Sequence, residues 1–304
     1  MAFTAKDVAL LREKTGCGMM DCKKALAASE GDMDKAMETL REKGLAAATK
    51  KAGRIAAEGV VYAAVNDAKN IGTVIEINAE TDFVAKNDSF QAFVETCATI
   101  VIEQNPADVE ALAACKVPGG TGTVEELLRE KILTIGENIK IRRFARAEGV
   151  LTTYVHGGGR IGVMVTFDTT PEIAAKPEFE VFAKDIAMQV AAATPTYLNK
   201  GDVPADQIAK EKEILTAQAI NEGKPANIAE KMVIGRINKY YKEVCLVEQP
   251  FVKNGDFSVV QYAENTGKEL GGKIVITGFV RFEKGEGLQK REENFADEVA
   301  NMIK

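Results

Sequence analysis

GVVYAAVNDAKNIGTVIEI (residues 59–77) and GVLTTYVHGGGRIGVMVTF (residues 149–167) follow one pattern, which predicts the core of the fold. In each, two runs rich in Val, Ile, Thr and Tyr flank a turn of Asn, Asp, Lys or Gly, which is typical of a β-hairpin. Five identities are in register: Gly59, Val60, Val65, Ile71 and Gly72 match Gly149, Val150, Val155, Ile161 and Gly162. An internal repeat of this kind predicts two related antiparallel hairpins.

A helix is expected after each hairpin, around residues 90–102 and 179–193. Both segments carry phenylalanine at i and i+3, as Phe90/Phe93 and Phe179/Phe182. A further alternating stretch, Ile274 to Phe282, predicts another strand. The expected class is therefore α+β, with a core of two related antiparallel β-hairpin/helix subdomains rather than a doubly wound α/β sheet.

The first 53 residues predict a compact three-helix module. Thr4 with Asp7 fits a capping box, so the first helix is expected to begin near Ala5. Asp32 is expected to cap the third helix, and Gly44 to end it as a residue with left-handed backbone. The Ala- and Lys-rich segment over residues 45–53 is expected to be a helical or flexible linker.

Other helices and loops are expected along the chain. A helix over residues 124–133 is expected to end near Gly136, after a loop over residues 105–122. Two helical stretches around the turn Gly223-Lys224-Pro225 predict an inserted antiparallel helical hairpin, and a last amphipathic helix is expected over residues 293–303. The expected division is an N-terminal module (1–53), core subdomains (54–145; 146–200 with 243–286), a helical hairpin (201–242) and a C-terminal helical module (287–304).

Composition narrows the class of protein. The 304 residues are 46% hydrophobic and 28% charged, which is a globular balance. The chain has no apolar run near the roughly 18 residues of a membrane span. Its first residues lack the apolar segment of a secretory signal, so a cytoplasmic location is expected. The formal net charge of −6 disfavours general nucleic-acid binding. Two basic clusters, Lys50/Lys51/Arg54 and Arg142/Arg143/Arg146, are interpreted as solvated faces.

The sequence offers little for catalysis or cofactors. Its five cysteines include no CxxC pair, and His156 is the single histidine. Gly267-Lys268 lacks the upstream glycine of a phosphate-binding loop, and Gly157–Gly159 joins two strands rather than a strand and a helix. We therefore expect no catalytic residue, no metal, no cofactor and no direct nucleotide binding.

Three stretches stand out as candidate contact sites. Met19-Met20 follows a glycine-rich turn, and one of the pair is expected in the core with the other exposed. Thr81-Asp82-Phe83-Val84 lies between a strand and a helix. There Thr81 or Asp82 could act as a helix cap and Phe83 as a hydrophobic staple, and the alternative is a protruding aromatic anchor. Ile135-Gly136 places an apolar residue beside a helix end.

Several longer motifs carry a family resemblance. TGCGMMDCKKAL (15–26), TDFVAKN (81–87), IGENIKIRR (135–143) and HGGGRIGV (156–163) resemble the elongation factor Ts family, as do QPFV (249–252) and TGFVRFEKGEG (277–287). The resemblance implies a translation factor that binds elongation factor Tu·GDP and promotes GDP release by displacing Mg²⁺ and phosphate-holding groups. It also implies an N-terminal module of ubiquitin-associated (UBA) type.

The resemblance assigns contact residues, all matched by motif. Asp82 and Phe83, with Thr81 and Val84, would push into the GTPase domain of elongation factor Tu and dislocate Mg²⁺. Further contacts would come from Ile135, Gly136 and His156 in the core, and from Arg12, Met19 and Met20 in the N-terminal module. The segment over residues 105–122 is longer than in many relatives. A homodimer stays open, and no membrane or nucleic-acid partner is expected.

Two readings from other classes compete with this one. A cysteine- or histidine-dependent enzyme would need a nucleophile and base pair, which the sequence does not offer. A cytosolic adaptor or RNA-binding protein would use the cluster from Arg142 to Arg146.

Overall fold

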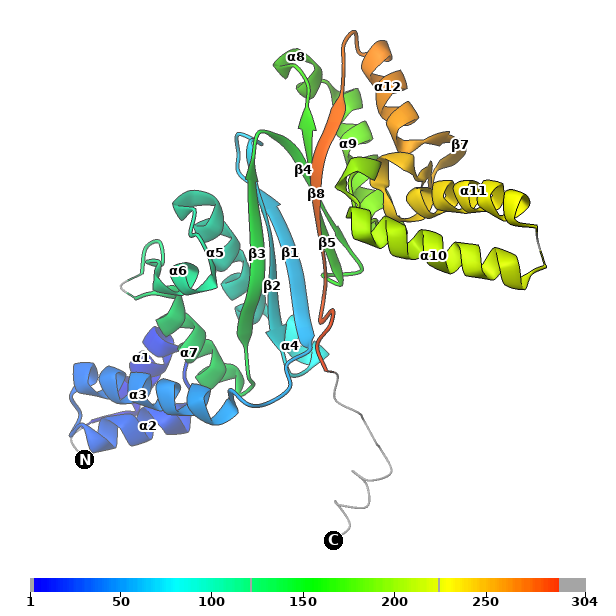
Figure 1. Cartoon of the computed structure of the whole chain (residues 1–304). Coiled ribbons are helices and arrows are strands. Elements are labelled where there is room, and N and C mark those ends of the chain that lie inside the picture. Colours follow the sequence, from blue (N-terminus) through cyan, green and yellow to red (C-terminus); the bar gives the residue numbers. More distant parts are fainter. Residues whose placement is uncertain (1–2, 121, 224, 290–304) are drawn as a thin grey trace.

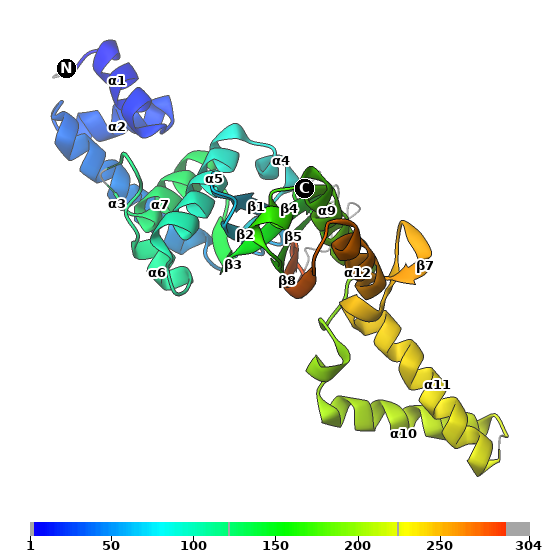
Figure 2. The ribbon, with the colours of Figure 1, turned by 90° about the horizontal axis from the view of Figure 1, so that it is seen from above.

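A computed structural model describes residues 3–120, 122–223 and 225–289. The described chain is elongated: an N-terminal helical module and a projecting helical hairpin lie at opposite ends of a central pair of sheets (Figure 2). None of the helices in these residues is long and apolar enough to cross a membrane.

The N-terminal module consists of α1 (Ala5–Thr15), α2 (Met19–Ala28) and α3 (Met33–Lys51). The Thr4/Asp7 capping box and the Asp32 cap are confirmed. The expected end of the third helix at Gly44 is wrong, because α3 continues to Lys51. A Cβ at Gly44 would lie 3.4 Å from the carbonyl oxygen of Arg129, so this glycine instead allows α3 to approach another helix closely.

The core contains two three-stranded antiparallel sheets. The first has the order β1-β2-β3 and the second β4-β5-β8. Their bounds are β1 Glu58–Val65, β2 Ile71–Ala79, β3 Lys140–Glu148, β4 Val150–His156, β5 Ile161–Asp168 and β8 Val275–Glu283. Each hairpin is followed by a long helix, α5 (Asp88–Gln104) or α9 (Pro177–Ala193), which covers the outer face of its sheet (Figure 1). The two related hairpin/helix units are therefore confirmed.

The inner faces of the two sheets pack against each other. Val61, Val74, Leu151 and Met164 form the buried cluster between them. The repeated glycines lie at this contact: a Cβ at Gly72 would be 2.7 Å from Leu151, and one at Gly162 would be 2.5 Å from Val61. The repeat thus marks two points where only a glycine lets one sheet approach the other.

The remaining elements surround this core. The helical hairpin is confirmed as α10 (Ala205–Asn221) and α11 (Ala226–Val244), and the helix that ends at Gly136 as α7 (Val124–Ile135). The shorter elements are α4 (Asp82–Ala85), α6 (Val109–Ala114), α8 (Pro171–Ala174), η1 (Lys200–Asp202), η2 (Leu246–Glu248), β6 (Pro250–Phe251), β7 (Asn254–Ser258) and α12 (Val259–Glu269).

Two differences from the expectations concern these elements. Residues 105–122 are not all loop, because Asp108 caps the short helix α6. The capping box of Ser258 and Gln261 begins α12, a helix that is absent from the sequence-based expectations. The helix expected over residues 293–303 lies outside the described residues. The proposed module boundaries stay a prediction.

Candidate partner-binding surface

The Thr81–Val84 segment directs one apolar side chain outward and the next one inward. Phe83 is 80% exposed, whereas Val84 is 6% exposed and belongs to the core under the first sheet. The hydrophobic-staple interpretation of Phe83 is therefore wrong. Val84 is nearly buried and anchors α4 from the core side. Asp82 is exposed beside Phe83.

Hydrogen bonds from the α7–β3 connection hold the start of α4. The Glu137 carboxylate accepts from the backbone N–H groups of Glu80 and Thr81, both at 3.0 Å, and from the Thr81 hydroxyl at 2.7 Å. Thr81 therefore does not cap α4 with its side chain, and Asn87 caps the next helix, α5. In return, the Asn138 backbone N–H donates to the Glu80 carboxylate at 2.6 Å.

A groove of about 400 Å³ joins the predicted contact segments. Its lining includes Gly16 from the N-terminal module, Phe83, and Ile135 at the end of α7. Ile135 is half-buried against the core, and Gly136 is exposed with a φ of +88°. Two predicted contact sites, Phe83 and Ile135, therefore border one groove, which the N-terminal module lines through Gly16; the predicted contacts Arg12, Met19 and Met20 are not among its lining residues.

The predicted contacts of the N-terminal module are all exposed. Arg12 lies on α1, and Met19 and Met20 begin α2, with 45% and 59% of their surfaces accessible. The expectation that one methionine is in the core is wrong, because Cys22, Ala25 and Leu26 fill the inward positions of α2.

His156 lies at the exposed end of β4, where the Tyr154 hydroxyl is 3.0 Å from its Nδ1. The three glycines after it all have positive φ and form the expected tight turn. The Val61 N–H donates to the Gly159 carbonyl at 2.8 Å, so this turn is attached to β1. His156 is therefore on the second subdomain, and it does not line the groove beside Phe83.

Comparison with known proteins decides the family. A sequence profile described as Elongation factor TS matches residues 80–286. Proteins named Elongation factor Ts are 54% identical over 303 residues in Clostridium perfringens (strain 13 / Type A) and 50% identical over 304 residues in Clostridioides difficile (strain 630). A third, from Clostridium botulinum (strain Eklund 17B / Type B), is also 50% identical over 304 residues. Each of these alignments covers 99% of both chains.

The chain belongs to the elongation factor Ts family. Its members are translation elongation factors that act as guanine-nucleotide exchange factors, and membership implies binding of elongation factor Tu. The resemblance inferred from the motifs is thus confirmed.

The arginine cluster of this elongation factor Ts chain differs from the expected solvated face. Arg142 and Arg143 bind the fully buried Glu76 carboxylate at 2.9 and 2.7 Å. A β-bulge, where Glu76 pairs with Arg143 and Ile77 with Ile141, brings both arginines to the same carboxylate. Arg146 donates to the Ile102 carbonyl at 3.2 Å and pairs with Glu148. The RNA-binding interpretation requires these three arginines to be available to phosphate groups, whereas each of them binds a group of the protein itself.

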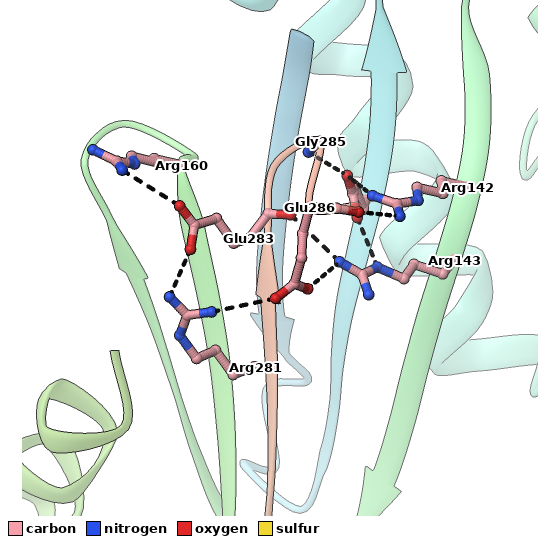
Figure 3. A network of polar contacts seen from close by, with 8 residues as sticks. Arg142, Arg143, Arg160, Arg281, Glu283, Gly285 and Glu286 are labelled. Carbon is pink, nitrogen blue, oxygen red and sulfur yellow. Dashed lines mark hydrogen bonds and ion pairs between the residues drawn. The ribbon is translucent and has the colours of Figure 1, made fainter. Parts of the chain in front are cut away.

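The same carboxylate attaches the chain after β8 to the first sheet (Figure 3). The Gly285 N–H donates to Glu76 at 2.8 Å, and Arg143 pairs with Glu286 at 3.0 Å. Burial alone would raise the pKa of Glu76. The hydrogen bonds from Gly285, Asn78, Arg142 and Arg143 outweigh burial and hold that pKa below its ordinary value.

The second basic cluster is likewise only partly solvated. The Lys51 ammonium donates to the Ile132 carbonyl at 3.1 Å, whereas Lys50 is exposed. Burial, with the nearby Arg54 charge, lowers the pKa of Lys51. Arg54 pairs with Glu80 at 3.4 Å. Lys51 and Arg54 thus connect α3 and its following segment to the elements that carry the groove.

The cysteines and His156 show no catalytic arrangement in the described residues. Burial raises the pKa of Cys17 and of Cys245, and it raises the pKa of Cys97 to about 12. A thiol is a weak nucleophile when its pKa is raised. No group of three or more His, Cys, Asp and Glu residues with metal-binding geometry occurs in the described part of the chain.

Sequence reasoning missed Glu80, Glu137 and Glu76. Glu137 lies inside the IGEN motif, where only Ile135 and Gly136 were singled out. The available signal was the polar pair Glu137-Asn138 directly after a glycine helix end. For Glu76, the signal was one acidic residue within a nearly continuous apolar strand, since β2 is buried along most of its length.

Proposed function

We propose that this chain promotes GDP release by inserting Phe83 into the GTPase domain of elongation factor Tu, with Asp82 beside it. The observation that carries the proposal is a phenylalanine 80% exposed to solvent on a one-turn helix that hydrogen bonds and a buried valine hold in place. An exposed aromatic side chain on a pre-ordered support is typical of an interface hot spot, because little ordering entropy is lost on docking.

The physical effect would be on the ion that holds the nucleotide. A GTPase binds GDP through backbone amides, side chains and Mg²⁺, and the ion compensates much of the phosphate charge. A phenyl ring inserted beside the Mg²⁺ site would displace the groups that hold the ion, so GDP would dissociate faster. Binding of the factor and binding of GDP then weaken each other by the same factor. The overall equilibrium between GDP and GTP is unchanged, and GTP in excess sets the direction.

A second contact would come from the N-terminal module. Arg12, Met19 and Met20 are exposed, and the nearby Gly16 borders the same groove as Phe83 and Ile135. Flexible methionine side chains suit a partner surface because they adapt to its shape. His156 and Gly136 would add contacts from the core.

Several finer points belong to the same proposal. We propose that the chain performs no covalent chemistry, uses no cofactor and acts in the cytoplasm. The raised thiol pKa values support the first point. The internal pairing of Arg142, Arg143 and Arg146 supports the absence of a nucleic-acid partner. A homodimer through the helical hairpin stays open: Ile214, Ile220 and Ile234 are exposed there.

The test is release of fluorescent GDP from elongation factor Tu after mixing with this protein. The release rate should rise hyperbolically with protein concentration above the spontaneous rate. The same experiment with the isolated GTPase domain should retain a large part of the acceleration. A release rate equal to the spontaneous one would refute the proposal, and binding to an RNA column in place of elongation factor Tu would favour the adaptor interpretation.

A further inference from the structure

The Glu137 carboxylate lies where the chain passes from β2 into α4, the helix that carries Phe83. We propose that Glu137 is a positioning residue for exchange, holding the start of α4 so that Phe83 stays in the orientation that acts on the partner. This inference rests on the proposed function of Phe83. It assigns to Glu137 a role that acts through Phe83 rather than through a contact with the partner.

The first observation concerns backbone donors that the sheet does not satisfy. The ladder between β1 and β2 ends where Glu58 pairs with Ala79. The next two N–H groups, of Glu80 and Thr81, both donate to the same Glu137 oxygen at 3.0 Å. The other Glu137 oxygen accepts from the Thr81 hydroxyl at 2.7 Å. Hydrogen bonds to a charged acceptor are among the stronger ones in proteins, so three of them fix this turn of the chain.

The second observation is that the contact is reciprocal. The Asn138 N–H donates to the Glu80 carboxylate at 2.6 Å, and the Asn138 amide donates to the Arg54 carbonyl at 2.8 Å. Two segments more than 50 residues apart in sequence therefore hold each other by exchanged side-chain and backbone bonds. Both segments border the groove, through Phe83 on one side and Ile135 on the other.

The third observation is that different residues hold the two ends of α4 around Phe83. Val84 anchors α4 on its core side, with 6% of its surface exposed. Glu137 holds the preceding end of α4, at Thr81. Phe83 lies between these two fixed points. Loss of the Glu137 bonds leaves Val84 buried but releases the start of the helix, so the direction of the Phe83 side chain becomes variable.

The consequence for exchange is a smaller population of complexes in which Phe83 is inserted. A complex saturated with the factor through its other contacts would hold Phe83 inserted for only part of the time, and the release rate falls in proportion to that fraction. The loss must be smaller than that caused by deleting the phenyl ring. We expect Glu137→Ala to lower the saturating release rate by about fivefold to tenfold, within the roughly thirtyfold expected for Phe83→Ala.

The experiment compares four single variants with Phe83→Ala and with the Glu137→Ala/Phe83→Ala double variant, by two readouts. Glu137→Ala removes the acceptors. Glu137→Gln is the conservative variant, because its amide oxygen can accept from both N–H groups while its NH₂ donates to the Thr81 hydroxyl. Thr81→Val removes one donor. Glu125→Ala is the matched control, since Glu125 is an exposed carboxylate on the same α7 helix and, among the described residues, pairs only with Arg129 of that helix. The readouts are saturating GDP release from elongation factor Tu and amide hydrogen exchange at residues 80 and 81.

The expected pattern has three parts. Glu137→Ala slows release and speeds amide exchange at both positions, Thr81→Val does so more weakly, and Glu137→Gln and Glu125→Ala stay within about twofold of the parent. In the Phe83→Ala background, Glu137→Ala adds no further loss, because it acts through the missing ring.

The contradicting results are distinguishable from failure of the proposed function. If Phe83→Ala slows release and a folded Glu137→Ala does not, the positioning role is wrong and the function of Phe83 stands. An equal loss from Glu137→Ala in both backgrounds would mean that Glu137 contacts the partner directly, which also overturns positioning. If Phe83→Ala leaves release unchanged, both proposals are wrong. Should Glu137→Ala fail to fold, Thr81→Val decides the question by the same criteria.

Discussion

Replacing Phe83 by alanine is expected to separate folding from exchange. Because 80% of its surface is already exposed, truncation removes little buried contact, and the free energy of unfolding should change by no more than about 0.5 kcal/mol. A buried staple would behave differently, since Phe→Ala in a core costs about 3–5 kcal/mol. The thermal melt therefore distinguishes the two local interpretations of this residue without the partner.

The magnitude of the exchange defect follows from the area available for docking. A phenylalanine buries about 150–250 Å² when fully enclosed. With four-fifths of that surface free and about 25 cal/mol per Å², complete burial against the partner contributes about 3–5 kcal/mol. Aromatic hot spots commonly cost about 2 kcal/mol or more when truncated. A loss of about 2 kcal/mol at the releasing step lowers the rate by roughly thirtyfold.

The assay is stopped-flow release of labelled GDP from elongation factor Tu across a range of factor concentrations. Phe83→Ala should lower the plateau rate, and Asp82→Ala should act in the same direction with a smaller effect, because an exposed carboxylate is screened by salt. Val181→Ala is a matched control: Val181 is an apolar residue 61% exposed on α9, in the other subdomain. A plateau for Phe83→Ala equal to that of the parent protein would refute the reasoning.

Three further predictions concern the module, the thiols and the buried carboxylate. Deleting residues 1–53 should leave a folded core and greatly weaken exchange. The Tm of the core should fall by about 5 °C, because Leu133 loses its packing on the module. Circular dichroism and GDP release test this, and full activity or loss of the core fold would contradict it. Serine substitution at each of three buried thiols (Cys17→Ser, Cys22→Ser and Cys245→Ser) should lower stability by about 1–3 kcal/mol and leave the saturating release rate unchanged. Denaturant melts measure the stability and GDP-release assays measure the rate. Lost activity in a folded variant would favour a thiol mechanism. Glu76→Ala should cost about 3 kcal/mol or more, because it removes the buried carboxylate that both Arg142 and Arg143 bind and leaves Arg143 with Glu286 alone. Folding lowers the pKa of Glu76, so this carboxylate contributes to the stability of the fold above its ordinary pKa of 4.5. That stability is lost as the pH falls from 4.5 through the pKa in the folded protein. In acid denaturation, Glu76→Gln should lack this part of the stability loss, and an acid profile equal to that of the parent would contradict the assignment.

The hairpins, the helices behind them and the caps at Thr4 and Asp32 could be predicted because each depends on local pattern. The capping box of Thr4 and Asp7 and the repeated glycines Gly72 and Gly162 are visible within short stretches of sequence. Gly44 shows the limit: a glycine near a helix end resembles a cap, and only the position of α7 shows that it serves close packing. The Glu76 network could not be predicted, since its partners Arg143 and Gly285 are 67 and 209 residues away in sequence.

The candidate site likewise has a part that could be predicted from sequence and a part that could not. Motif resemblance singles out Phe83, Ile135 and Met20 as predicted contacts, but a local pattern of Thr, Asp, Phe and Val fits a staple as well as an anchor. Exposure decides between them, and exposure depends on what the rest of the chain covers. Glu137 was missed because its function is to satisfy backbone donors that follow the last paired residue of a strand, and sequence does not show where a strand pairing ends.

Whether Phe83 acts through the Mg²⁺ ion is tested most directly by comparing the parent protein and Phe83→Ala in buffered Mg²⁺ and in excess chelator. With Mg²⁺ present, the two saturating GDP-release rates should differ by roughly thirtyfold. With the ion removed, the step that Phe83 assists is already complete, and the two rates should converge. The same large ratio under both conditions would contradict the mechanism, because Phe83 would then accelerate release without acting on the ion.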